Sequence, residues 1–100
     1  MNNNPKQLII PPSAIGVEDS FEVLRVWTTP HGPVVSLLPD AWADPAAWGI
    51  LLVDIARHVA DAKSGGVLET KRDILSRLKA GFDAEWGEPT DTPQGQFVSD

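Results

Sequence analysis

The sequence contains no cysteine, and this absence excludes several kinds of chemistry. Disulfide bonds, zinc sites built on thiolates and thiol catalysis all require that side chain. Long apolar runs are missing too. The run at residues 8–10 is too short for a secretory signal, and no segment approaches the ~20 apolar residues of a membrane span. We therefore expect a cytoplasmic protein without a membrane partner.

Basic residues are scarce: 8 Lys and Arg stand against 14 Asp and Glu, for a net charge of −6. Such a field repels phosphate backbones and anionic membrane surfaces, so we expect no nucleic-acid partner. Gly-rich phosphate loops, nucleophile elbows and paired metal motifs are also missing. We expect no cofactor and favour a protein that is not an enzyme.

The chain is long enough for one domain. Residues 1–20 are rich in Asn and Pro, which predicts a flexible N-terminal arm. Residues 21–98 are predicted to form a single small α+β domain with a loosely held C-terminal segment. The alternating segment "FEVLRVWT" at 21–28 and the segment "VVSLL" at 34–38 predict an antiparallel hairpin around the turn "TPHGP".

Two helices are predicted to follow the hairpin, which gives the order ββαα. The first runs from about 45 to 63, with Asp44 as its N-cap and "SGG" at its end. Its first half, "AAWGILLV", carries no charge, so we expect that half to be deeply buried. The second helix is predicted to begin at a capping box formed by Thr70 and Asp73, and to end at Gly87 and Pro89.

The two strands and two helices carry more apolar surface than they can cover within one chain. Both strands have apolar residues on both faces, and a lone two-stranded hairpin is marginal. The simplest resolution is a homodimer in which the second copy extends or covers the sheet. The alternative is a third strand from the N-terminal arm, with the C-terminal segment filling the remaining surface.

The segment "DIARHVAD" places Asp54, His58 and Asp61 on one helical face. Two carboxylates beside an imidazole can bind a metal or act in acid–base chemistry. Arg57 shares the face, however, and would repel a cation, so we favour a solvated face without a metal. His31 in the turn is a weaker candidate, because ordinary turn chemistry explains its position.

Four tryptophans are many for this length. Three of them fall on expected core stripes, but Trp42 lies in a loop between two aspartates. Large aromatic side chains often anchor interfaces, so Trp42 is the best candidate for an interface anchor. The residues predicted for a possible interface are Trp42, Trp27, Leu24 and Val26.

A resemblance rests on two runs, "VLRVWTTPHGPVVSLLPDAWADPAAWGILLVDIARHVA" and "GFDAEWGEPTD". These resemble a family of short bacterial proteins catalogued only as a domain of unknown function, over most of residues 16–97. The resemblance implies a small stand-alone α+β domain that includes the second run. It transfers no catalytic residue.

Two functional classes remain open. The first is a non-enzymatic, dimeric interaction or accessory protein that acts through a surface such as that around Trp42. The second is a small-ligand-binding protein or minor enzyme that uses His58 with Asp54 or Asp61. We favour the first.

Overall fold

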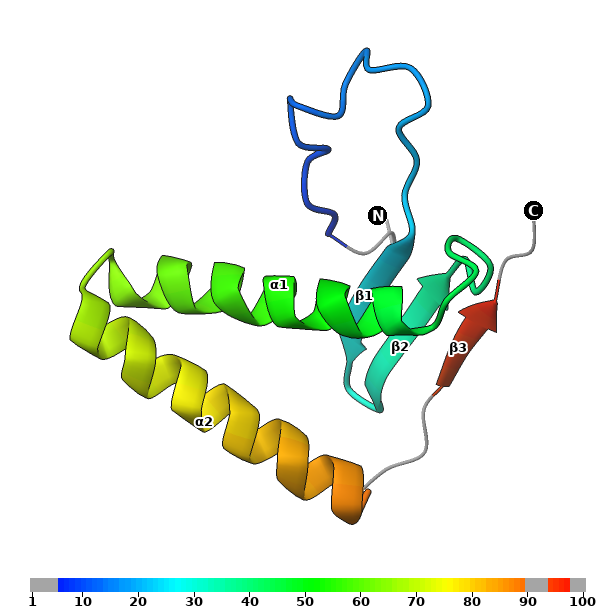
Figure 1. Ribbon diagram of the computed structural model, residues 1–100. Helices are drawn as coiled ribbons and strands as arrows, with labels where there is room; N and C mark the ends of the chain where they lie inside the picture. Colours follow the sequence, from blue (N-terminus) through cyan, green and yellow to red (C-terminus); the bar gives the residue numbers. More distant parts are fainter. Residues whose placement is uncertain (1–5, 90–93, 98–100) are drawn as a thin grey trace.

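The computed structural model describes residues 6–89 and 94–97. Its elements, in chain order, are β1 (Leu24–Thr29), β2 (Gly32–Leu37), α1 (Ala46–Ser64), α2 (Leu68–Gly87) and β3 (Gln94–Phe97). Figure 1 shows one small sheet and a helical hairpin whose closed end projects away from it. The predicted α+β class and the order ββαα are confirmed. Residues 1–5 of the predicted arm and residues 90–93 and 98 of the predicted domain lie outside the described residues.

The β1–β2 hairpin has the predicted antiparallel pairing, with Val26 opposite Val35. Its turn is held by the Thr29 hydroxyl, which donates to the Gly32 carbonyl at 2.7 Å and accepts from the His31 N–H at 3.1 Å. Gly32 has a φ of 110°, a conformation that other residues rarely adopt. Local turn chemistry therefore accounts for the backbone at His31.

The third strand comes from the C-terminal segment. β3 pairs with β2 in parallel, with Val35 opposite Gly95, so β2 is the central strand. Residues 6–20 form turns and contribute no strand. For residues 6–20, the alternative in which the N-terminal arm adds the third strand is therefore wrong: residues 94–97 of the same chain extend the sheet.

α1 begins much as predicted, because the Asp44 carboxylate accepts the N–H of Ala46 at 3.0 Å. It ends at Gly65, whose φ of 61° is the left-handed conformation that glycine favours. The predicted start of α2 is wrong. The helix begins at Leu68, and Val67 precedes it without a side-chain cap, so Thr70 lies inside the first turn. Gly65 and Gly66, both with positive φ, reverse the chain between the helices. The connection is therefore shorter than the one expected from a capping box at Thr70 and Asp73.

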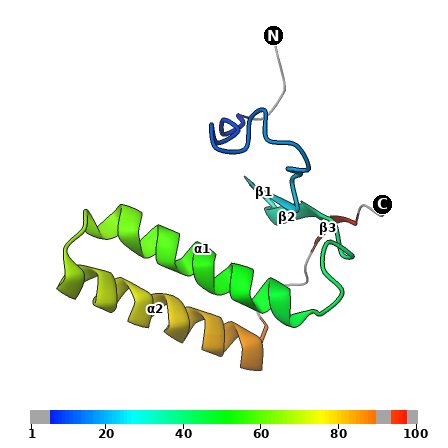
Figure 2. The ribbon, with the colours of Figure 1, turned by 45° about the horizontal axis from the view of Figure 1, so that its top comes forward.

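The two helices pack against each other, but they do not pack closely against the sheet. No Cα atom of α1 or α2 lies within 8 Å of a Cα atom of a described strand. Figure 2 shows the sheet on one side of α1 and α2 on the other. The radius of gyration is 15.8 Å, whereas a compact domain of 100 residues has about 13 Å. A single chain is thus more open than a typical globular domain.

Few side chains are buried in this open arrangement. Within the described residues, only Ala60 and Ser64 are buried, both on the side of α1 that faces α2. The expected deep burial of "AAWGILLV" is wrong within one chain, because Ile50, Leu52 and Val53 are exposed. Of the three tryptophans expected on core stripes, Trp86 is 79% exposed.

Candidate interaction surface

An apolar stripe runs along one side of α2. It consists of Leu68, Leu75, Phe82 and Trp86, and we call it the α2 stripe. Spacings of seven, seven and four residues place these side chains on one side of a helix. Leu68 is 58% exposed, Phe82 51% and Trp86 79%. Trp86, expected in the core, is among the most exposed large side chains of α2.

The aromatic end of the α2 stripe is locally ordered. The rings of Phe82 and Trp86 stack with their centroids 5.6 Å apart and an interplanar angle of 24°. Stacking restricts both side chains without burying them, so they form a preorganised apolar surface near the end of α2.

A second apolar stripe lies on α1. It consists of Leu52, Ile55 and Val59, and we call it the α1 stripe. These side chains are between 37% and 47% exposed, so they are better covered than the aromatic end of α2. Trp48 lies on the same side of the helix at its first turn.

The predicted interface residues are not gathered on one surface. Trp42 packs edge-on against Trp48 of its own chain, with ring centroids 5.2 Å apart, and is 37% exposed. The other three lie on β1, where Leu24 and Val26 alternate with Trp27 and point to opposite faces of the sheet. Sequence reasoning did not single out the α2 stripe, although its spacings of seven, seven and four residues are visible in the sequence.

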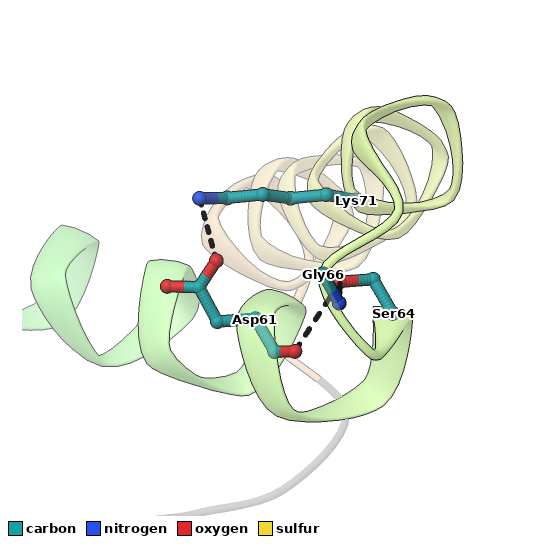
Figure 3. Close-up of polar contacts among 4 residues, drawn as sticks. All are labelled: Asp61, Ser64, Gly66 and Lys71. Atoms are coloured by element: carbon teal, nitrogen blue, oxygen red, sulfur yellow. Dashed lines mark hydrogen bonds and ion pairs between the residues drawn. The ribbon is translucent and has the colours of Figure 1, made fainter.

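Asp54, His58 and Asp61 are all exposed on α1. Asp61 is directed toward α2, where its Oδ1 lies 2.6 Å from Nζ of Lys71 (Figure 3). His31 lies in the β1–β2 turn, on a different element. Across residues 6–89 and 94–97, no three His, Asp or Glu side chains are placed to hold a metal ion. The absence of a metal site here nevertheless stays a prediction.

An open groove of about 420 Å³ lies between the helices. Its lining residues are Lys63, Thr70, Asp73, Ile74, Arg77 and Leu78. Lys63 comes from the end of α1 and the others from α2. The groove combines two cations with one carboxylate and a hydroxyl, but it contains no imidazole or second carboxylate that would suit general acid–base chemistry.

The family of this chain follows from a family model, described as "Domain of unknown function (DUF5076)", that matches residues 7–90. The chain belongs to the DUF5076 family. The resemblance to a domain of unknown function, based on residues 23–60 and 81–91, is therefore confirmed. No curated protein matches the chain.

A solved structure shares the fold of this DUF5076 chain. It is described as "Structure of a putative pyruvate dehydrogenase from the photosynthetic bacterium Rhodopseudomonas palustrus CGA009". Its sequence is 41% identical, the TM-score is 0.71, and the match covers 91% of this chain and 92% of that chain.

In the described part of our chain, neither helix is long and apolar enough to cross a membrane.

Proposed function

We propose that this DUF5076 chain is a homodimeric interaction protein without a catalytic site of its own. The observation that carries the proposal is the separation of its two layers. α1 and α2 contact each other and the strands contact each other, but the described helices and strands leave their remaining apolar faces uncovered. Monomeric proteins rarely expose large contiguous apolar patches, whereas interaction sites do.

The energies favour self-association. Full burial of one Leu, Phe or Val side chain contributes about 1.5–3 kcal/mol. Association costs about 4–15 kcal/mol in lost translational and rotational freedom. Several half-exposed side chains from each of two copies can offset that cost, and the α1 and α2 stripes together supply them.

The activity named for the Rhodopseudomonas protein does not enter this proposal. The described residues contain no cluster of three His, Asp or Glu that could bind a metal. The alternative of a ligand site at His58 is also weakened, because the carboxylate of Asp61 is already paired with Lys71. We further propose a cytoplasmic location and no nucleic-acid partner; the net charge of −6 supports the second point, because it repels phosphate backbones.

Sedimentation equilibrium or light scattering at micromolar concentration tests the proposal. The expected mass is twice 10.8 kDa, and dilution should reveal a reversible dissociation. A monomeric mass at every concentration would refute self-association. Turnover of pyruvate by the purified chain would contradict the non-catalytic part.

A further inference from the structure

We infer that the dimer forms by antiparallel packing of α2 against α2 of a second copy, along the α2 stripe. The inference rests on the proposed function and adds to it a defined surface and an orientation. The α2 stripe binds a second copy of this chain. A two-fold axis places the stripes of the two copies face to face.

The first support is the position of the stripe relative to α1. The half-buried residues of α2 are Lys71, Ile74, Leu75 and Leu78. The other members of the stripe, Leu68, Phe82 and Trp86, stay exposed. α1 therefore leaves much of the apolar surface of α2 uncovered, which is the pattern expected of a helix with a second helical neighbour.

The second support is the length of the stripe. Leu68 is the first residue of α2, and Trp86 is next to its last residue. A helix of 20 residues is about 30 Å long, so the stripe offers a continuous seam along the whole element. Phe82 and Trp86, already stacked on each other, provide large aromatic side chains of the kind that carry much of the binding energy of interfaces.

The third support is the charge pattern of α2, which identifies the occupant. The first part of the helix carries four cations and two carboxylates: Lys71, Arg72, Arg77, Lys79, Glu69 and Asp73. The last part carries only carboxylates, at Asp83 and Glu85, and Glu88 follows directly. An antiparallel second copy places the basic part of each helix beside the acidic part of the other. A parallel copy would place like charges together.

The helix dipole strengthens this argument. Negative side chains are unfavourable near a helix C-terminus, and the last turn of α2 contains no basic residue. Within the chain, Asp83 is paired with Lys79 at 2.7 Å. The basic start of a partner helix would supply further positive charge at the acidic end, so the antiparallel partner compensates an unfavourable feature of the single chain.

The decisive experiment measures dimer dissociation for Phe82→Asp and Trp86→Asp by sedimentation. Both side chains are exposed in one chain, so the variants should keep their helical circular dichroism. The dissociation constant should rise about 30-fold or more, as for truncation of an aromatic anchor. The matched control is Ile9→Asp, because Ile9 is 84% exposed but lies outside the helices. Its dissociation constant should be unchanged.

The outcomes separate the two proposals. A wild-type monomer would refute the proposed function together with this surface. A wild-type dimer that persists in both α2 variants would leave the proposed function standing and overturn the α2 surface. Dissociation by Leu52→Asp, with the α2 variants still dimeric, would place the interface on the α1 stripe instead.

Orientation is tested separately, with spin labels in the cysteine-free chain. Thr70→Cys and Gly87→Cys place a single label near either end of α2. Antiparallel packing predicts label-to-label distances of about 25–30 Å in both homodimers, close to the length of the helix. Short label-to-label distances in both homodimers would mean a parallel arrangement and would overturn the antiparallel orientation. This measurement does not depend on whether Phe82→Asp or Trp86→Asp folds.

Discussion

Lys71 and Asp61 form an ion pair that joins α2 to α1 beside the turn of the helical hairpin, with Nζ and Oδ1 2.6 Å apart. The same turn is closed by Ser64, whose hydroxyl donates to the Asp61 carbonyl and accepts the N–H of Gly66, both at 3.2 Å (Figure 3). Because Ser64 and Ala60 are also the buried residues of α1, the helices are held most firmly at their closed end.

Replacing Lys71 with Met should lower the free energy of unfolding by less than about 1 kcal/mol. The two side chains are 31% and 57% exposed, so solvent screens their attraction. The loss should shrink further in 1 M salt. Lys79→Met is the matched control: it removes a pair within α2 only and should cost about 0.3–0.5 kcal/mol. A loss of several kcal/mol at Lys71 in urea titrations would contradict this account.

Gly81→Ala should raise the free energy of unfolding by about 1 kcal/mol, because glycine inside a helix is less favourable than alanine by that amount. An added Cβ would meet no atom within 4 Å. Gly65→Ala is the control with the opposite sign, since its φ of 61° strains any residue with a Cβ. A destabilising Gly81→Ala, measured by thermal unfolding, would mean that another chain approaches this position closely.

The hairpin and the two helices could be predicted because their signals are local. The turn around His31 and Gly32, and the glycines after Ser64, are encoded within a few residues of the structures they produce. β3 could not be predicted in this way. Its sequence, "QGQF", has little strand propensity, and it is a strand because it pairs with β2.

The candidate surface was predicted only in outline. The excess of apolar residues indicated self-association, but periodicity alone cannot distinguish a helix face that packs inside one chain from a face that packs on another. Trp86 fitted the core pattern of the second helix, yet it is 79% exposed. Trp42, predicted as an interface anchor, contacts Trp48 of its own chain.

A chain truncated after Pro89 should lose stability, because it lacks the strand that pairs with β2 over Val34 to Leu37. Each lost backbone hydrogen bond costs roughly 0.5–1.5 kcal/mol, so the loss should amount to a few kcal/mol. The uncovered edge of β2 should also promote aggregation. Thermal unfolding and light scattering measure both effects. A truncated chain as stable and soluble as the full chain would show that β3 adds little to the fold.

The last prediction concerns Asp54, His58 and Asp61. We expect a solvated helix face, because all three residues are exposed and Asp61 is engaged by Lys71. His58→Ala should therefore change the free energy of unfolding by less than about 0.5 kcal/mol, as surface substitutions usually do. Calorimetric titration with zinc and with manganese should give the same weak or absent heat for the wild type and for His58→Ala. Tight binding that disappears in His58→Ala would instead identify this face as a metal site, with Asp61 leaving Lys71 to become a ligand.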